Sequence, residues 1–567
     1  MNDRALNSLR IGNFKAFGEV QNVPVKPITL VFGPNSSGKS SLIHSLALAN
    51  EAFRVGRLDI FRTEIGGTAI DLGGFRQYVH KTERSRRVEW GAELDAKQLT
   101  GILADRLGSV KKIAISVLFG LEGELSAHDL LSGLEHAEAS PIFAGKAQEG
   151  TEAKVVVMSY DLSGDGESLA KMSRRRDGTL RLDQLNRTHS VFHRVLEAIL
   201  LANTTTEIVS ESDFQLLYEK VDRLVPEISA RADRFLPEII LTTSARESRT
   251  DALLQPVSRG QRSADLAETL GLFFPRAVAE LVNGVNEVVR KEVGAFTYLG
   301  PLRSFPPRHL AFAESEDRNW FAGGGYAWDV VRQDAEIRET VNRWLGAPAL
   351  KTPYRIRVRT LFALDQMAKP LAGELDELVR NAPVFPSDET DIGYIAQLDD
   401  SDAEARQILK SMRDSNVDRI NELVLIDQRT KTVVSHRDVG IGVSQVLPVL
   451  VAAYGLKGRI VAMEQPEIHL HPALQAELAD VFIEAATGDR RNTFILETHS
   501  EHLVLRMLRR IREKVLRAED LAILFVEPLP DRGSRVLEMK VDEDGDFIDR
   551  WPGGFFEESY QEKFAGR

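Results

Sequence analysis

The sequence lacks cysteine entirely across its 567 residues. This absence excludes disulfide scaffolds, cysteine-ligated zinc, iron–sulfur clusters and cysteine nucleophiles. A long hydrophobic run is also missing, because the longest, residues 447–456, spans only about ten residues and cannot cross a bilayer. The first residues, MNDRALNSLRIGNF, hold no apolar segment of the kind found in secretory signals. Together these absences predict a soluble, cytoplasmic protein with no membrane partner.

Basic residues are not in excess. The 72 lysines and arginines are outnumbered by 84 aspartates and glutamates, which leaves a net charge of −12. This balance argues against a protein that coats nucleic acid, although a local basic patch is still allowed. With 43% hydrophobic and 28% charged residues the composition is globular, and the length predicts two to four structural units.

Residues 33–40 read GPNSSGKS and fit the phosphate-binding pattern GxxxxGK[ST]. They follow the apolar segment Ile28–Phe32, a predicted strand, and open a predicted helix over Ser40–Phe53. Glycines let successive backbone N–H groups curl around a phosphate, and the helix N-terminus adds its positive end. Lys39 would neutralise the β- and γ-phosphates of ATP, and the Ser40 hydroxyl would ligate Mg²⁺. The predicted nucleotide-binding residues here are Gly33, Pro34, Asn35, Ser36, Ser37, Gly38, Lys39, Ser40 and Ser41.

Two further apolar segments end in residues that suit the same chemistry. The strand predicted from Arg459 ends in Glu464, and a carboxylate at that position can hold Mg²⁺ beside the phosphate loop. The strand predicted over Thr493–Leu496 leads to His499, which would touch the γ-phosphate. The same turn also reads as a helix start with Ser500 as its N-cap, and the two interpretations are compatible.

A glycine-rich segment, Asp438–Gln445, precedes an apolar helix. Pro448 is tolerable there because it is placed in the first helical turn. In isolation Ser444 would be a plain N-cap. Beside the other three elements it becomes a candidate ligand of ATP.

In this order the four elements resemble the ABC-type ATPase head shared by SMC proteins, RecF-like proteins and OLD-type ATPases. The matching segments are IGNFKAF at 11–17, the phosphate loop, the signature-like Asp438–Gln445, EQPEIHLHP at 464–472 as Walker B and D-loop, and Thr498-His499-Ser500 as the switch histidine. Further segments resemble a bacterial set of OLD-like, AAA-type ATPases with an uncharacterised C-terminal domain. They are Asp71-Leu72-Gly73, YLGPLR at 298–303 and the C-terminal WPGGFF at 551–556.

The resemblance implies an α/β fold, namely an ABC-type ATPase head with a mixed β lobe and a RecA-like P-loop core. In such heads the signature loop faces the nucleotide of a second protomer. One phosphate loop and one signature per chain therefore imply a homodimer with two composite ATP sites, with Ser444 acting in trans. Several OLD-like ATPases belong to anti-phage defence systems, where they work with a nuclease or toxin partner.

One position departs from the family pattern. The residue after the metal ligand is normally a carboxylate that serves as base for water attack, and here it is Gln465. A neutral amide can orient water but cannot take its proton, and Glu467 is the candidate substitute. Slow hydrolysis or a nucleotide-gated switch is therefore expected. His469 and His471 have spacing that suggests a metal, but D-loop positions are preferred because two histidines rarely suffice for tight zinc binding.

The remainder of the chain is expected to insert a β-rich lobe and a helical arm into the head. Pro226, Pro237 and Pro275 would break that arm into short helices, which argues against a long coiled coil. The predicted parts are 1–90 (N-terminal part of the head), 91–190 (β-rich lobe), 191–296 (helical insertion), 297–432 (mixed connecting region), 433–520 (C-terminal part of the head) and 521–567 (small β appendage).

Three other features each have a purely structural interpretation beside a functional one. The acidic run 542–546 resembles a metal cluster, but Asp544-Gly545 favours a hairpin turn, and no nuclease domain is expected. Gln77 is a candidate for the Q-loop glutamine that links the metal to the helical region. Two basic stretches could meet DNA phosphates, although a solvated face is favoured for each. They are a predicted loop over 171–176 and the helix with Arg506, Arg509, Arg510, Arg512 and Arg517.

The leading hypothesis is an ATP-hydrolysing, Mg²⁺-dependent OLD-like ATPase that acts as sensor or scaffold of an anti-phage defence complex. A RecF- or SMC-like ATPase of DNA repair or chromosome maintenance is the alternative. A nucleotide-binding interaction protein with negligible turnover is a third class, consistent with Gln465.

Overall fold

The computed structural model divides the chain into two compact units. The first comprises residues 1–302, 321–323 and 452–567, and the second comprises 303–320 and 324–451. The structure describes residues 4–56, 58, 63–65, 69–123, 153–203, 211–231, 234–239, 262–303, 319–362, 419–434 and 441–552. Within these ranges, no helix combines the length and hydrophobicity that a membrane crossing requires.

The first unit contains a six-stranded sheet, which we call the central sheet. In spatial order its strands are β13 (Phe296–Leu299), β17 (Ile460–Glu464), β18 (Thr493–Glu497), β3 (Ile28–Phe32), β19 (Leu521–Leu529) and β20 (Gly533–Glu538). The first five run parallel and β20 is antiparallel. Every residue of β3 and β18 is buried, as expected for a parallel sheet covered on both faces.

Helices α1 (Lys39–Val55), α14 (Pro472–Thr487) and α15 (Glu501–Arg512) follow β3, β17 and β18 in the chain. Each begins where a parallel strand has ended, so the loops before them gather at the carboxyl edge of the sheet. In open parallel sheets this edge is where ligands bind. The helix expected over Ser40–Phe53 is confirmed as α1.

The C-terminal segment corrects one expectation. Residues 521–567 were expected to form a separate β appendage, yet β19 lies inside the central sheet and pairs with β3 over Leu521–Phe525. A strand that starts so far along the chain carries no local sign of its partner. The hydrophobic run in LAILFV suits a strand buried on both faces, and all six of those residues are buried.

The second sheet of this unit has nine antiparallel strands. In spatial order they are β12 (Glu238–Ile239), β11 (Ser229–Arg231), β10 (Leu180–Leu185), β9 (Glu167–Arg174), β8 (Lys154–Gly164), β7 (Lys112–Glu122), β6 (Val88–Asp95), β1 (Leu6–Gly12) and β2 (Gln21–Pro24). Buried residues alternate with less buried ones over most of β7, which is the period-2 pattern of a strand with one core face. The antiparallel strands expected between Val88 and Leu182 are confirmed.

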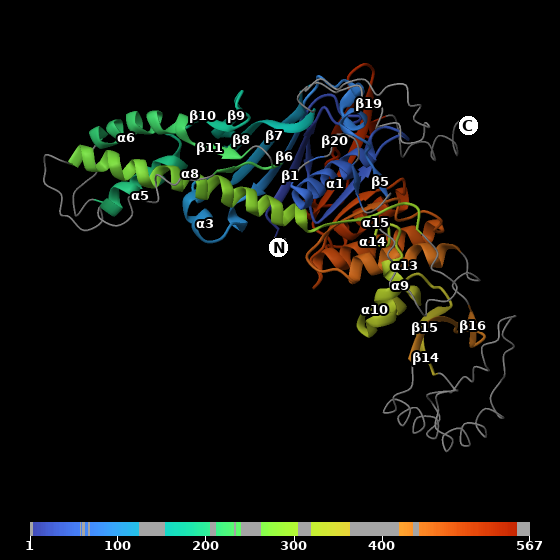
Figure 1. The fold of residues 1–567 in the computed structure, drawn as a ribbon. Coiled ribbons are helices and arrows are strands. Elements are labelled where there is room, and N and C mark those ends of the chain that lie inside the picture. The colour runs from blue at the N-terminus through green and yellow to red at the C-terminus, as the bar shows by residue number, and fades with distance from the viewer. Residues whose placement is uncertain are drawn as a thin grey trace. The chain divides into compact units, whose positions relative to one another are not determined.

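A helical group packs with this sheet and corrects a second expectation. It contains α5 (Ser190–Asn203), α6 (Glu211–Leu224) and α8 (Arg262–Gly294), and α8 contacts both of the others (Figure 1). Pro275 was expected to break the chain here, but α8 runs through it for 33 residues. Phe274, Val278 and Leu281 are fully buried around the proline. Packing of this apolar face outweighs the roughly 3 kcal/mol that an internal proline costs.

The described residues of the first unit also include the shorter elements β4 (Glu64–Ile65), β5 (Ile70–Asp71), α2 (Phe75–Tyr78) and α3 (Ile102–Leu107).

In the residues of the second unit that the structure describes, there are a three-stranded antiparallel sheet and three helices. Its elements are α9 (Tyr326–Gln333), α10 (Ala335–Leu345), β14 (Tyr354–Phe362), β15 (Arg419–Asp427), β16 (Thr432–Val434) and α13 (Ile441–Tyr454), of which α13 ends in the first unit. Pro448 was placed in the first turn of α13, but it lies in the interior, seven residues after Ile441. Its missing N–H therefore interrupts the helical hydrogen bonding rather than falling on an end that has none.

Candidate functional site

The loop of residues 33–40 joins β3 to α1 as the sequence predicts. Gly33 and Gly38 have φ angles of 148° and 103°, which side-chain-bearing residues rarely adopt. A Cβ added at Gly38 would lie 2.4 Å from the Cβ of Ala16. The glycines are therefore needed both for the backbone path and for the close approach of neighbouring chain.

Residues near the C-terminus brace this loop. The Ser534 hydroxyl is buried and donates to the backbone carbonyl of Ser37 at 2.6 Å. A Cβ on Gly33 would come within 2.4 Å of the Val526 carbonyl oxygen. Sequence reasoning missed both contacts, because no pattern near Ser534 indicates its partner nearly 500 residues earlier.

The Lys39 ammonium is held inside the loop. Its Nζ donates to the carbonyl oxygens of Gly33 and Pro34 at 3.1 and 2.9 Å, and lies 3.9 Å from Glu497 Oε1. Burial lowers the pKa of Lys39, and the nearby Glu497 carboxylate opposes that shift. A cation that is buried and held mainly by carbonyl oxygens is well placed to gain from an incoming phosphate.

Ser40 donates a hydrogen bond of 2.6 Å from its Oγ to Glu497 Oε2. Glu497 ends β18 and is buried, and this burial raises its pKa to about 7 against the opposing hydrogen bond from Ser40. Glu497 was not among the predicted site residues. The signal that could have found it is its place at the end of an apolar strand directly before Thr498 and His499.

Glu464, the predicted metal ligand, ends β17 and is the register partner of Glu497. Its Oε1 accepts a hydrogen bond from the Tyr298 hydroxyl at 3.0 Å and lies 3.3 Å from His44 Nε2. The other ring nitrogen of His44 is 2.8 Å from Lys15 Nζ. Burial lowers the pKa of His44 and lowers that of Lys15 to about 8. Glu464 is thus oriented by a chain of polar contacts.

Gln465 and Glu467, the candidates for handling the attacking water, tie two loops together. The backbone N–H of Gln465 donates to the backbone carbonyl of Glu497 at 2.8 Å, and Gln465 has a left-handed φ of 45°. Glu467 is buried, and its Oε1 accepts the backbone N–H of His499 at 2.8 Å. The acid proposed to replace the missing base therefore also holds the histidine loop.

His499 stands between β18 and α15. Burial lowers the pKa of its imidazole, with a smaller contribution from the charge of Lys39. The neutral ring can present one N–H donor to a phosphate oxygen. Ser500 Oγ accepts the N–H of Leu503 at 3.1 Å, so the expected N-cap is confirmed beside the histidine.

The two histidines of the D-loop-like segment have separate local settings. His471 is the N-cap of α14, where its Nδ1 accepts the N–H of Ala473 at 3.3 Å. His469 lies in the preceding turn with a left-handed φ of 65°. In the part of the chain that the structure describes, no three histidine, aspartate or glutamate side chains gather into a metal-binding group.

Magnesium nevertheless fits the donors at the phosphate loop. A hydroxyl from Ser40 and carboxylates from Glu464 and Glu497 are the oxygen ligands that Mg²⁺ prefers. Magnesium at such sites usually takes one or two protein ligands and completes its shell with nucleotide phosphates and water. A complete protein cage is therefore not required here.

Ser444, the predicted trans ligand, lies on α13 in the second unit and is buried. The next residue, Gln445, exchanges two hydrogen bonds with Arg303: Gln445 Nε2 donates to the Arg303 carbonyl at 3.1 Å, and Arg303 Nη1 donates to the Gln445 carbonyl at 3.2 Å. The end of the YLGPLR segment thus supports the start of α13. Residues 438–440 and 553–556 lie outside the described residues.

Three remaining candidates have local structural roles. Gln77 Oε1 accepts the N–H of Gly74 at 3.0 Å, so its side chain caps the short helix α2. Asp542–Asp546 forms the expected hairpin turn, in which the Asp542 carboxylate accepts two backbone N–H groups. The predicted basic loop at 171–176 is wrong over most of its length, because β9 continues to Arg174, whose guanidinium makes two hydrogen bonds with Glu122.

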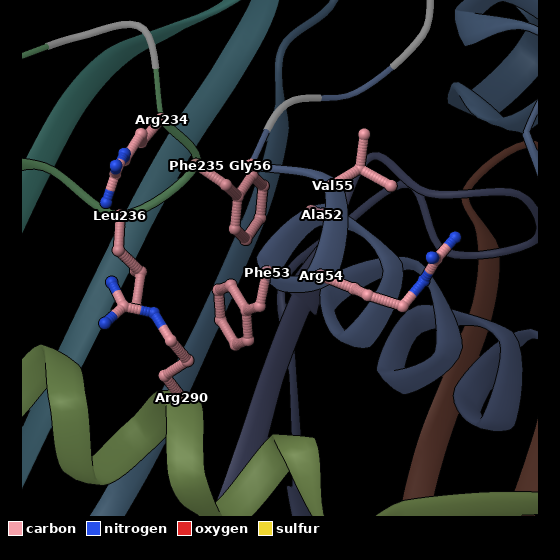
Figure 2. Close-up of a pocket in the computed structure, with 9 residues that line it drawn as sticks. All are labelled: Ala52, Phe53, Arg54, Val55, Gly56, Arg234, Phe235, Leu236 and Arg290. Carbon is pink, nitrogen blue, oxygen red and sulfur yellow. The ribbon is translucent and has the colours of Figure 1, made fainter.

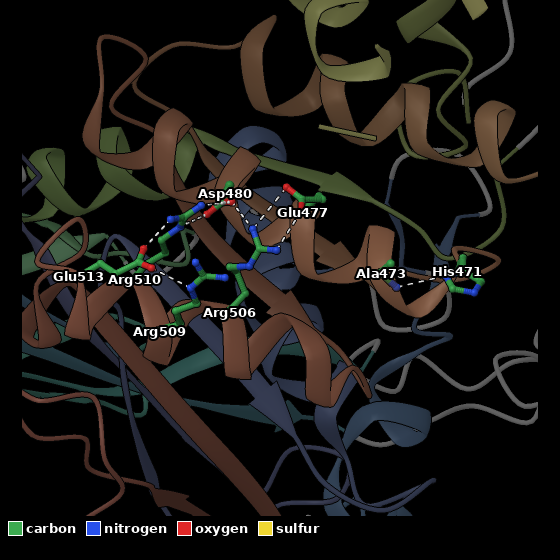
Figure 3. A network of polar contacts seen from close by, with 8 residues as sticks. All are labelled: His471, Ala473, Glu477, Asp480, Arg506, Arg509, Arg510 and Glu513. Carbon is green, nitrogen blue, oxygen red and sulfur yellow. Dashed lines mark hydrogen bonds and ion pairs between the residues drawn. The ribbon is translucent and has the colours of Figure 1, made fainter. Parts of the chain in front are cut away.

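The basic helix α15 is neutralised by neighbouring acids. Arg506 and Arg510 pair with Asp480 of α14, and Arg506 also pairs with Glu477 (Figure 3). Arg509 pairs with Glu513, and Arg512 pairs with Asp546. The placement of Arg517 on this helix is wrong, because α15 ends at Arg512; Arg517 pairs with Asp520. These pairs favour a structural role for the helix over a DNA-binding one.

A cavity of about 270 Å³ opens at the far end of α1 (Figure 2). Its walls include the rings of Phe53 and Phe235, whose centroids are 5.6 Å apart, together with Arg54, Arg234 and Arg290. α1 has 17 residues, so this cavity lies about 25 Å from the phosphate loop at the other end of the helix. It is distinct from the candidate nucleotide site.

Comparisons with known proteins agree with an ATPase. Residues 298–506, fewer than half of the chain, match the family described as "AAA domain, putative AbiEii toxin, Type IV TA system". No curated protein matches.

Several solved structures of SMC heads are similar over nearly the whole chain. An SMC head bound to the C-terminal winged-helix domain of ScpA is 10% identical, with a TM-score of 0.34, covering 95% of this chain and 98% of that one. A Pyrococcus furiosus SMC head with an extended coiled coil, bound to the C-terminal domain of ScpA, is 10% identical, with a TM-score of 0.32 and coverages of 94% and 96%. The Thermotoga maritima SMC head domain is 8% identical, with a TM-score of 0.30 and coverages of 95% and 100%. With its phosphate loop, its α/β fold and the AAA family match, the protein is an ATPase.

Proposed function

We propose that this protein is a cytoplasmic, ATP-gated switch that acts as sensor or scaffold in a bacterial anti-phage defence complex. It works as a homodimer with composite ATP sites and controls an effector partner, a nuclease or a toxin. The OLD-like motifs support this role, and the description of the matched family names a toxin of a toxin–antitoxin system.

One observation carries the switch: the acids at the carboxyl edge of the sheet are engaged in holding the site together. Glu497 accepts from Ser40, Glu467 accepts from the backbone of His499, and Glu464 accepts from Tyr298. The position expected to hold the base is Gln465, whose amide cannot take a proton from water. This arrangement suits tight nucleotide binding with slow hydrolysis.

The chain's own residues have distinct roles in this proposal. Lys39 binds the β- and γ-phosphates, and Gln465 orients the attacking water. Neutral His499 donates a hydrogen bond to the γ-phosphate. Mg²⁺, held by Ser40 with Glu464 or Glu497, supplies charge neutralisation when bound with ATP. Because ADP lacks the γ-phosphate, the state of His499 differs before and after hydrolysis.

A mixing experiment tests the composite sites. Ser444→Arg should block dimer closure while each protomer keeps its affinity for ATP, and Lys39→Ala should lose binding in its own loop. If Ser444 acts in trans, a heterodimer of the two variants holds one doubly defective site and one intact site. Some ATPase activity should therefore return on mixing. Full activity of Ser444→Arg alone, or no recovery despite proven heterodimers, would contradict the proposal.

The defence role is tested in cells. The chain expressed with its neighbouring genes should lower phage plating efficiency, and Lys39→Ala in the same context should restore it. Sensitivity of a deletion strain to DNA damage, with unchanged phage plating, would instead favour a repair ATPase of RecF or SMC type.

A further inference from the structure

Hydrogen bonds join the loop after β17, residues 465–471, to the loop after β18, residues 498–500, and to the end of β18. The Gln465 N–H donates to the Glu497 carbonyl at 2.8 Å, and the His499 N–H donates to the Glu467 carboxylate at 2.8 Å. The first bond joins the loop after β17 to the end of β18, and the second joins the loop after β18 to the loop after β17. A displacement of either loop therefore breaks hydrogen bonds made by both.

Gln475 adds a third connection from the first turn of α14. Its Nε2 donates to the carbonyl of Leu470 at 3.0 Å, and its Oε1 accepts the Ser500 hydroxyl at 2.7 Å. Ser500 is the N-cap of α15. A single amide side chain thus joins the end of the first loop to the start of the helix that carries the second.

Arg506 joins α15 to α14 at a position farther from the nucleotide site (Figure 3). Its guanidinium lies 2.8 and 3.3 Å from the two carboxylate oxygens of Glu477, and it reaches Asp480 at 2.5 Å. Only 14% of the Arg506 side chain is exposed. Asp480 also receives two hydrogen bonds from Arg510, at 2.6 and 2.7 Å.

This ion-pair group differs in kind from an ordinary surface salt bridge. Hydrogen bonding by Glu477 raises the pKa of Arg506 above its usual range, so the charge is fixed. A fork that engages two carboxylates has a defined geometry, which a single point charge cannot reproduce. Removal of the guanidinium leaves half-buried acids partly uncompensated, and the packing of α15 on α14 loosens.

We propose that Arg506 and Gln475 are positioning residues that make the two loops a single switching body. A movement of His499 on contact with a γ-phosphate is thereby transmitted to residues 465–471, the segment that resembles the D-loop. The inference rests on the proposed function, in which His499 distinguishes ATP from ADP. Coupling of two loops requires an element that both of them bias, and the clamped pair α14–α15 is that element.

Arg509 provides a matched control on the same helix. Its side chain is 59% exposed and pairs with Glu513 at the surface of α15. Exposed pairs four residues apart on a helix contribute only about 0.3–0.5 kcal/mol. Arg509→Met removes the same chemical group as Arg506→Met but leaves the α14–α15 clamp intact.

The experiment measures the affinity of full-length protein for ATP and ADP by calorimetry, and kcat and KM for ATP hydrolysis. Arg506→Met and Gln475→Met should each lower the ATP-to-ADP affinity ratio at least fivefold and lower kcat at least tenfold. KM for ATP should rise together with the ATP dissociation constant, because slow hydrolysis makes the two nearly equal. Affinity for ADP should change less than threefold, because the phosphate loop on β3 and α1 is untouched. Arg506→Lys should recover only part of the loss, and Arg509→Met should match wild type.

The outcomes separate this inference from the proposed function. If wild type does not distinguish ATP from ADP and does not hydrolyse ATP, the proposed switch is wrong. If wild type does both, and Arg506→Met and Gln475→Met behave like Arg509→Met, the positioning role is wrong. Should Arg506→Met fail to fold, Gln475→Met decides, since it removes two neutral-group hydrogen bonds and leaves no charge unpaired.

Discussion

The substitution Glu497→Gln tests the role of Glu497 separately from that of Glu464, its neighbour at the carboxyl edge of the sheet. The substitution keeps the size of the side chain and removes its charge from the hydrogen bond with Ser40. We expect slower ATP hydrolysis, a weaker response to Mg²⁺, and equal or tighter binding of ATP in the absence of Mg²⁺. The last effect arises because a buried negative charge no longer repels the phosphates.

The size of the effect follows from the contact itself. A hydrogen bond to a charged group contributes about 1.5–3 kcal/mol, and every 1.4 kcal/mol is a tenfold change in rate. If the 2.6 Å bond organises Ser40 for the transition state, turnover should fall about 10- to 100-fold. Lys39 loses a counter-charge at 3.9 Å, which leaves its ammonium more available to the nucleotide.

The assay is steady-state ATPase activity over a Mg²⁺ titration, with calorimetry of ATP in EDTA. Glu538→Gln is the control, because Glu538 belongs to the same sheet but pairs with Lys26 near the surface. Wild-type turnover with an unchanged Mg²⁺ dependence in Glu497→Gln would refute the reasoning. Glu497 would then be a structural tether, and Glu464 alone would be left as the carboxylate for the metal.

Other substitutions test the remaining assignments. Lys39→Ala should abolish ATP binding, because the loop loses its ammonium, and unchanged affinity in calorimetry would contradict the nucleotide site. Glu464→Gln should remove metal-dependent hydrolysis; if Glu467→Gln instead traps bound ATP while Glu464→Gln keeps full turnover, the two roles are reversed. Asn286→Ala should lower the free energy of unfolding in urea by about 2–3 kcal/mol, because this buried amide bonds both the Tyr160 hydroxyl and the Pro237 carbonyl at 2.8 Å. A loss below about 0.5 kcal/mol would show that water replaces those bonds.

Local chemistry made the phosphate loop predictable. The glycines, Lys39 and Ser40 are adjacent in the chain, and their strand and helix carry clear apolar patterns. The antiparallel strands after Val88 were predictable for the same reason, since alternation along a strand needs no knowledge of its partner. The N-cap role of Ser500 also follows from its immediate neighbours.

Features that depend on distant partners escaped prediction. Glu497 is a site residue because β18 lies beside β3, a pairing that links residues more than 460 positions apart. The place of β19 depends on the same kind of long-range pairing. Pro275 led to the wrong prediction of a helix break. The cost of a proline inside a helix is local and visible in the sequence, whereas the packing that offsets it comes from the distant helices α5 and α6.

The position of β3 between β18 and β19 has a consequence for synthesis of the protein. The phosphate-loop strand leaves the ribosome before both of its neighbours in the sheet, which are translated more than 460 residues later. At about 5–20 residues per second this interval lasts on the order of half a minute or more. During it, Ile28–Phe32 has two unpaired edges and a sequence that is apolar except at Thr29. The nascent chain therefore exposes an aggregation-prone segment until β18 and β19 have been translated, and nucleotide cannot assist folding before then.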